Sequence, residues 1–419
     1  MSTYKKIPKA KGFDNTIRLK NEGYPFIPTI MSDLHTDIFQ TRLMGKKIIC
    51  ITGKEAAKLF YDPEYFIRHK ANPKRIQKTL FGVNAIQGMD GDAHLHRKQL
   101  FLSILSEERL TLLREIVRTK YMNAIPKWKE KEQVCLFTET ASILCESTCE
   151  WCDVPITPQD ARIRSEQFMT MVYAIAQIGP KYWKGKSARK STEEWIESVI
   201  KEVRSGRRKP KKESALYQIS NYHDLTDVPL TDRAAAIELI NVIRPIVAIS
   251  IYIVYAALAL HEHPQYIDLL KVPNDPYYNL FVQEVRRYYP LGPFLGARVK
   301  KDFKWHDYLF KEGTLVFLDA YGINSDPSIW KSPKVFSPEN FRDWDEDEFE
   351  LIPQGGGDPA TGHRCPGEGI TLELMKDTID FLVNKIEYTV PPQNLSYSLK
   401  KIPTLPESGF LMTNINKRL

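Results

Sequence analysis

The sequence QGGGDPATGHRCPGEGI, residues 354–370, decides the fold that we expect for this chain. Three consecutive glycines precede a lone cysteine, Cys365, and Gly367 and Glu368 then open a segment with helical periodicity that runs to residue 386. Glycine lets a backbone pass close to a bulky neighbour. The dipole at a helix N-terminus favours a thiolate, the form of cysteine that ligates metals. This stretch therefore predicts a helix over 368–386 and a metal-ligating thiolate, Cys365, just before its first turn.

The whole chain has the composition of a globular protein with a large core. It has 419 residues, 42% of them hydrophobic and 26% charged, and a net charge of +7. The N-terminus contains no long apolar run, so we expect no secretory signal and a cytoplasmic location. The uncharged run 246–260 is short for a bilayer, which favours a buried core helix over a membrane span. The basic stretches 181–190 and 204–212 are typical of solvated helix ends and loops, and we expect no nucleic-acid partner.

Hydrophobic periodicity predicts a mainly α protein, with apolar residues recurring every three or four positions. We find no repeat or domain boundary, so the simplest arrangement is one large α-rich domain over 1–419 with small β-sheets at its margin. The predicted helices are 108–128, 136–151, 160–178, 192–203, 232–260, 279–289 and 368–386, and the predicted strands lie at 47–51, within 294–318 around a turn at 311–313, and at 386–390.

Two locally unfavourable residues, Arg244 and Pro245, lie inside the apolar run of the 232–260 helix. A buried guanidinium without a partner is costly, and a proline in a helix interior costs roughly 3 kcal/mol. A salt bridge beside a kink would explain the pair. A receptor for a buried carboxylate would also explain it, because the planar guanidinium matches a carboxylate in two parallel hydrogen bonds.

A second cysteine pattern competes with the first. Cys145, Cys149 and Cys152 have the spacing that holds a four-iron cluster in radical enzymes that use adenosylmethionine. Offsets of four and three residues also place the three thiols on one face of a helix. Because the chain lacks repeated strand–helix units, buried structural thiols are the favoured interpretation.

The H-R-C-x-G-E loop around Cys365 and the E-V-R-R segment at 284–287 together resemble the haem-thiolate enzymes of the cytochrome P-450 superfamily. This resemblance implies that Cys365 is the proximal ligand of the haem iron, and that Glu284 and Arg287 pair one helical turn apart to brace its loop. Thiolate donation in this family favours O–O cleavage. Two departures concern the bracing: Asp358 replaces the usual aromatic residue, and Asn340 replaces an arginine, with Arg342 as a possible substitute.

The segments NVIRPIVAIS, PQGGGD, GHRCPGEGIT and FVQEVRRYYP resemble the bacterial fatty-acid peroxygenases, which include β-hydroxylating enzymes from Bacillus. Ordinary superfamily members carry an acid–alcohol pair in the central helix, where this chain has Arg244-Pro245. The resemblance implies haem b, hydrogen peroxide as oxidant and no reductase partner. Arg244 would bind the carboxylate of a long-chain fatty acid, which itself acts as acid–base catalyst, while Pro245 shapes the helix. Hydroxylation would occur at C3 (β) and C2 (α), because anchoring one end of the substrate fixes which hydrogens are reached.

Several further residues receive roles from the resemblance. Gln87 stands where hydroxylating members have glutamine and the alkene-forming decarboxylase has histidine; a neutral amide cannot donate a proton as an imidazolium can. His94 and Lys98, with Arg97 between them, are expected to bind the haem propionates. The expected acyl-pocket residues are Phe81, Val172, Ile175, Leu291 and Phe294.

We therefore expect a peroxide-dependent fatty-acid hydroxylase. The alternative within the same chemistry is a fatty-acid decarboxylase that forms terminal alkenes, which Gln87 disfavours. A conventional oxygen-using monooxygenase is disfavoured by the missing acid–alcohol pair. A haem-binding sensor would need Cys365 but not Arg244, and a radical Fe–S enzyme would depend on Cys145, Cys149 and Cys152.

Overall fold

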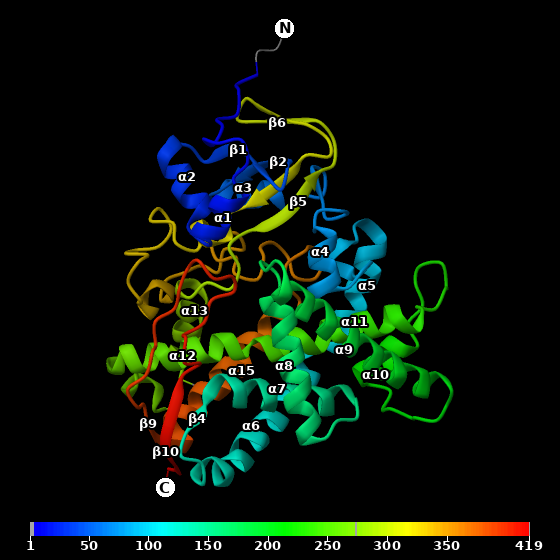
Figure 1. Ribbon diagram of the computed structural model, residues 1–419, viewed down its shortest axis with the longest axis vertical. Helices are drawn as coiled ribbons and strands as arrows, with labels where there is room; N and C mark the ends of the chain where they lie inside the picture. The colour runs from blue at the N-terminus through cyan, green and yellow to red at the C-terminus, as the bar shows by residue number, and fades with distance from the viewer. Residues whose placement is uncertain (1–3, 273–274, 419) are drawn as a thin grey trace.

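Helices make up most of the fold, as the periodicity predicts. The computed structural model describes residues 4–272 and 275–418. Figure 1 shows a five-stranded sheet with three short helices at the N-terminal end of the molecule and the long helices gathered at the other. The mainly α class is confirmed. The helices are α1 Thr16–Glu22, α2 Phe26–Leu34, α3 Lys54–Phe60, α4 Lys74–Ile76, α5 Gly91–Ile104, α6 Glu107–Lys129, α7 Leu136–Cys152, α8 Pro158–Tyr173, α9 Pro180–Arg204, α10 Ala215–Ser220, α11 Asp232–Ala248, α12 Ser250–Glu262, α13 Tyr277–Tyr288, α14 Ala320–Ile323 and α15 Glu368–Asp380.

The largest sheet has the strand order β1-β2-β8-β5-β3. β2 pairs with β8 in parallel, with Ile48 opposite Leu315, while the other neighbours are antiparallel. Gly313, with φ +74°, forms the predicted turn ahead of β8. The strands are β1 Ile38–Leu43, β2 Lys46–Ile51, β3 Phe66–Ile67, β4 Val134–Cys135, β5 Leu295–Val299, β6 Phe303–Trp305, β7 Tyr308–Phe310, β8 Leu315–Leu318, β9 Ile386–Thr389 and β10 Leu411–Lys417.

The central apolar helix is divided into two. Pro245 lies within α11 without ending it, and the division comes at Ile249, whose N–H bonds to the Ile246 carbonyl three residues back at 3.1 Å. The stretch from Asp232 to Glu262 is long and apolar enough to cross a membrane by length and composition alone. Its most apolar window is 89% buried by the rest of the protein, which is the behaviour of a core helix.

Helix ends differ from the sequence expectations by several residues. The helix predicted at 160–178 ends at Tyr173, and the one predicted at 192–203 is the second half of α9, which begins at Pro180. The helix predicted at 368–386 ends at Asp380, followed by a single π-type turn, Phe381–Lys385. Terminal turns are the least predictable part of a helix because local and tertiary hydrogen bonds compete there.

Candidate functional site

The cysteine loop folds back on its own backbone. The Cys365 N–H donates to the Gln354 carbonyl at 3.0 Å. Gly355 has φ +98°, and a Cβ there would lie 2.9 Å from the Tyr61 hydroxyl oxygen. A Cβ on Gly356 would lie 2.8 Å from the Glu348 carbonyl oxygen. The glycines are therefore required for close approach, as predicted, and the loop has little room to relax.

The sulfur of Cys365 lies where the first turn of α15 begins. Gly367 is the N-cap residue of α15, two positions after the cysteine. Burial raises the pKa of the Cys365 thiol, while the Gly367 N–H and the positive charges of Lys98 and Arg286 act in the opposite direction. A thiolate in such a place is stabilised fully only by a bound cation, so the site has the chemistry of a metal ligand.

The Glu284–Arg287 ion pair is present and bonds to the segment 324–340, whereas its role in bracing the cysteine loop stays a prediction. Both side chains of Glu284 and Arg287 are fully buried, and Arg287 donates to the two carboxylate oxygens at 2.6 and 2.7 Å. Asn340 completes the network, because its amide donates to Glu284 at 3.5 Å. Arg342 does not take that place: its side chain is exposed and pairs with Glu339 at 2.5 Å. The residue that replaces the usual arginine thus contacts the carboxylate itself.

A second buried ion pair, which the sequence did not reveal, ties α13 to the cysteine loop. Arg286 is fully buried and donates to Glu368 in the first turn of α15 and to Gln283 at 2.5 Å. Glu368 also accepts from Arg364 at 2.6 Å, and the two arginines lower the pKa of its carboxyl group. The two adjacent arginines in E-V-R-R therefore pair with different carboxylates, because their side chains leave the helix in different directions.

Several basic side chains on and around α5 make few contacts with carboxylates. Lys98 is buried and donates to the Gly362 and Arg364 carbonyls at 2.9 and 2.7 Å. Burial lowers its pKa to about 8. The His94 ring stacks on the His363 ring with centroids 4.1 Å apart, and burial lowers the pKa of His94 to about 3. A neutral His94 can act as a hydrogen-bond donor to an anion.

Arg68 joins this cluster and was missed from the sequence, where a lone arginine after the short strand β3 gives no signal. It is buried, and its guanidinium lies 4.4 Å from the centroid of the Phe60 ring. The same guanidinium donates a hydrogen bond to the Phe60 carbonyl at 3.3 Å. Within the described residues no carboxylate lies within ion-pair distance of it. Uncompensated buried cations are costly, so Arg68 and Lys98 fit the carboxylates of a group such as haem. The Cys365 thiol and these cations together match the cofactor that the resemblance implies.

Arg97 lies in a different environment from its helical neighbours. It is buried and pairs with Glu238 of α11 at 2.6 Å. Glu238 also accepts from the Ile86 N–H at 3.2 Å and from Asn241 at 3.3 Å. Arg97 thus joins α5 to α11, and its predicted contact with a propionate stays a prediction.

Arg244 is a buried cation with almost no partner. The residue is 6% exposed, and in the described part of the chain its guanidinium makes one hydrogen bond, to the Asn241 side-chain oxygen at 3.4 Å, while Nε makes none. Burial and the nearby Arg189 lower its pKa to about 9. No salt bridge beside the proline is present among the described residues, which leaves the alternative of a site for an anion.

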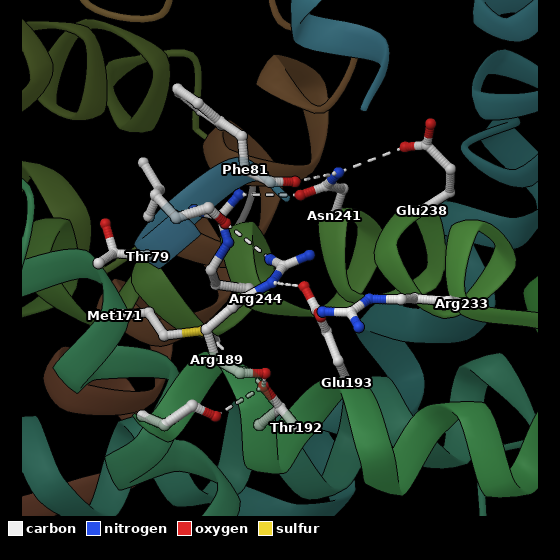
Figure 2. A network of polar contacts seen from close by, with 12 residues as sticks. Thr79, Phe81, Met171, Arg189, Thr192, Glu193, Arg233, Glu238, Asn241 and Arg244 are labelled. Atoms are coloured by element: carbon white, nitrogen blue, oxygen red, sulfur yellow. Dashed lines mark hydrogen bonds and ion pairs between the residues drawn. The ribbon is translucent and has the colours of Figure 1, made fainter. Parts of the chain in front are cut away.

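The neighbouring Arg189 provides a comparison within the same region. It donates to Glu193 at 2.6 Å and to the Leu80 carbonyl at 2.7 Å, and Glu193 also receives Arg233 at 2.8 Å (Figure 2). Arg189 is therefore neutralised by a carboxylate of the protein. Figure 2 shows that Arg244 is joined only to Asn241, which donates in turn to the Phe81 carbonyl. Of the two arginines, Arg244 is the one whose positive charge is available to bind an anionic ligand.

Other predicted substrate residues fall into two groups. Phe81 lies beside Arg244, with the guanidinium carbon 5.9 Å from the ring centroid, and the buried amide oxygen of Gln87 has no partner. Phe294 packs elsewhere, on the Phe317 ring at 4.4 Å between centroids. Phe81, Val172, Ile175 and Leu291 all pack in or against the main hydrophobic core.

The competing cysteine pattern lies on a helix, as the periodicity favours. Cys145, Cys149 and Cys152 are fully buried on α7. A hydrogen bond to Cys145 and burial both raise the pKa of Cys149. Residues 4–272 and 275–418 contain no group of three or more His, Cys, Asp or Glu side chains arranged to hold a metal. These thiols are core side chains, and the radical Fe–S alternative has no support.

Known proteins resemble this chain both in sequence and in structure. The sequence profile "Cytochrome P450" matches residues 256–412. Among curated sequences, ferruginol synthase of Isodon rubescens is 35% identical over 127 residues, or 29% of this chain and 25% of its own length. The chain thus matches about a quarter of the length of such curated relatives.

Solved structures match over nearly the whole chain. Cytochrome P450EX alpha (CYP152N1) with myristic acid is 40% identical, covers 99% of this chain and 100% of its own, and gives a TM-score of 0.95. A variant of cytochrome P450 OleT in complex with arachidonic acid is 35% identical, with 99% of both chains covered and a TM-score of 0.96. Cytochrome P450SP alpha (CYP152B1) with (R)-ibuprophen is 40% identical, covers 97% of this chain and 99% of its own, and gives a TM-score of 0.93.

Proposed function

Since the chain belongs to the cytochrome P450 superfamily, in its branch of fatty-acid peroxygenases, we propose that it hydroxylates long-chain fatty acids with hydrogen peroxide. The product is the C3 (β) hydroxy acid with some C2 (α) isomer, and water is the second product. The single observation that carries this proposal is Arg244, a buried cation that has no anionic partner among residues 4–272 and 275–418. A bound carboxylate supplies that partner, and relatives have been solved with myristic and arachidonic acids.

Haem b fits the residues of the loop and of α5, within one domain spanning 1–419. Cys365 would ligate the iron as a thiolate, and His94, Lys98, Arg97 and Arg68 would hold the propionates. When bound, the haem supplies the chemistry that delivers one oxygen atom of the peroxide to a C–H bond. The protein holds the loop in place, because Arg286 donates to Glu368 just after the cysteine, while Arg287 fixes the earlier segment through the Asn324 and Pro333 carbonyls.

Arg244 orients the substrate through two parallel N–H···O bonds to its carboxylate. Phe81 lies against the guanidinium, so the alkyl chain leaves the charged end along apolar side chains. A carboxylate held there can accept a proton from hydrogen peroxide and return it, which replaces the acid–alcohol pair of ordinary superfamily members. The substrate thereby brings its own acid–base group, and no reductase is required.

Gln87 favours hydroxylation over alkene formation. Its buried side-chain oxygen has no partner in the described part of the chain. An amide can orient a substrate or a water molecule by hydrogen bonds, but it cannot donate a proton near neutral pH as an imidazolium can. Decarboxylation is therefore a side reaction. We propose that the enzyme acts in the cytoplasm.

The test is incubation of the haem-loaded protein with a C14–C20 fatty acid and hydrogen peroxide, without reductase or NADPH. The expected result is β-hydroxy acid as the main product, resolved by chain position with mass spectrometry. A carbon monoxide difference spectrum of the reduced protein checks thiolate ligation separately. Turnover that requires a reductase, or terminal alkene as the main product, would contradict the proposal.

A further inference from the structure

Exposed apolar side chains gather on three segments near the N-terminal end of the chain and the α8–α9 connection. Their exposed fractions are large for residues of this kind: Phe13 81%, Ile17 73%, Met44 54%, Ile178 59% and Trp183 60%. Scattered exposed apolar residues are ordinary on any protein surface, whereas a contiguous group marks an interaction site. The contacts between the segments therefore decide whether these five residues form one surface.

Arg75 of α4 connects two of the segments. Its guanidinium donates to the Gln177 carbonyl in the α8–α9 connection and lies 4.0 Å from the Met44 sulfur in the β1–β2 turn. It also lies 5.0 Å from the centroid of the Tyr182 ring, which contacts the Trp183 ring at 5.5 Å. The β1–β2 turn and the start of α9 are thus neighbours on one side of the molecule.

The N-terminal segment joins the same side. The Met44 N–H donates to the Thr16 hydroxyl at 2.6 Å, and the Gly45 N–H donates to the Asp14 carboxylate at 2.7 Å. Arg42 lies 4.9 Å from the Phe13 ring centroid. The segments that carry Phe13, Ile17, Met44, Ile178 and Trp183 are therefore neighbours, and we call their exposed side chains the apolar–basic face.

The charge of this face is strongly positive. Asp14 is the one acidic residue in the stretches 11–20, 42–47, 72–78 and 174–187, and its carboxylate already accepts from Gly45 and Thr16. Glu22 and Asp33, just beyond, pair with Arg18. The same stretches carry nine exposed lysines: Lys11, Lys20, Lys46, Lys47, Lys74, Lys78, Lys181, Lys184 and Lys186.

We propose that the apolar–basic face docks on the surface of an anionic lipid bilayer. Exposed aromatic and aliphatic tips suit the boundary between headgroups and acyl chains, and lysines beside them suit anionic phosphates. A nucleic acid would match the lysines but leaves the aliphatic side chains without a role. The docked molecule lies on the membrane and does not span it.

The docked orientation brings the bilayer close to the substrate site. The chain runs from Arg75 through the turn Gln77–Phe81, and Phe81 lies against Arg244. The end of α8, which carries Val172, leads directly into Gln177 and Ile178. A fatty acid dissolved in the bilayer would thus reach Arg244 from beneath the docked face. This access route rests on the proposed function, whereas the docking itself does not.

Sedimentation with vesicles tests the docking without any turnover. The haem-loaded full chain should bind vesicles of phosphatidylglycerol and phosphatidylcholine at least tenfold more tightly than vesicles of phosphatidylcholine alone, and salt should weaken the binding. The double variant Ile178→Ser/Trp183→Ser should lose tenfold or more. The control, Leu225→Ser/Val228→Ser, replaces side chains that are 55% and 54% exposed on the α10–α11 connection and should bind as the parent does.

Three outcomes would overturn the proposal. The first is that the parent does not bind anionic vesicles at low salt, and the second is that both double variants lose the same affinity for vesicles. The third outcome is that Ile178→Ser/Trp183→Ser binds a polyanion such as DNA as tightly as the parent does, which would make the face a site for polyanions. Hydroxylation of a fatty acid supplied in detergent should be unchanged in Ile178→Ser/Trp183→Ser. A protein that binds vesicles but does not turn over fatty acids would disprove the proposed function and leave the docking standing.

Discussion

Replacing Arg244 by alanine should remove the preference of the protein for a carboxylate. The drop in the pKa of Arg244 to about 9 from 12.5 corresponds to about 5 kcal/mol spent in keeping the guanidinium charged without an anion. A bound carboxylate would offset a large part of this cost, because two charge-assisted hydrogen bonds contribute roughly 3–6 kcal/mol. We therefore expect affinity for a fatty acid to fall by about 10²–10⁴-fold.

Spectral titration of the haem-loaded protein with myristic acid and with its methyl ester measures the effect. The ester has the same chain but no charge, so it reports the apolar contacts alone. The parent should prefer the acid strongly, and Arg244→Ala should bind both ligands with similar affinity. Arg233→Ala is the matched control, because Arg233 lies in the same network but is mostly exposed and pairs with Glu193.

Two results would refute this reasoning. If Arg244→Ala binds the acid as tightly as the parent does, the guanidinium is not the carboxylate receptor. If acid and ester weaken by the same factor, the substitution has collapsed the pocket and not removed a charge interaction. Thermal unfolding of the ligand-free variant should show little loss of stability, because an unpaired buried cation stabilises nothing.

Three further predictions follow from other parts of the site and the fold. Gln87→His should raise the alkene fraction of the products severalfold, measured by gas chromatography; an unchanged ratio would show that an imidazole there does not protonate or orient the reacting groups. Arg286→Met breaks a buried pair and should lower the free energy of unfolding by about 3 kcal/mol. It should also lower the share of thiolate-ligated haem in the carbon monoxide spectrum; a thiolate-type Soret band as strong as the parent's would contradict its role behind Cys365. Burial raises the pKa of Asp319 to about 7 from 3.8, so the native state binds the extra proton and stability falls as pH rises from about 4 to about 7. Asp319→Asn should flatten the dependence of Tm on pH across that window, and an unchanged slope would assign it to another group.

Several features of the fold could be predicted from the sequence because they depend on local chemistry. The period of apolar residues indicated most long helices, and the three glycines with Cys365 indicated a loop held close to its own backbone. The helix position of Cys145, Cys149 and Cys152 followed from their offsets alone. Helix ends were less predictable: α8 stops at Tyr173, because the chain must turn there towards α9.

Residues that act through distant partners could not be assigned from the sequence. Arg286 and Arg287 are adjacent and chemically identical, yet one pairs with Glu284 on its own helix and the other reaches Glu368, which is 82 residues away. Arg68 gave no local signal, and Arg342 was named as the possible substitute for the missing arginine, whereas Asn340 itself contacts Glu284.

The sequence by itself determined the mainly α class, the cysteine ahead of a helix, and the presence of an arginine inside an apolar helix, since composition and spacing express these directly. Only the tertiary structure decided which buried cations are neutralised. Arg97 and Arg189 have carboxylates of the protein beside them, and among the residues that the structure describes Arg244 has none. The physical reason is that the cost of a buried charge depends on what lies within a few ångströms in space, and chain order does not specify that neighbour.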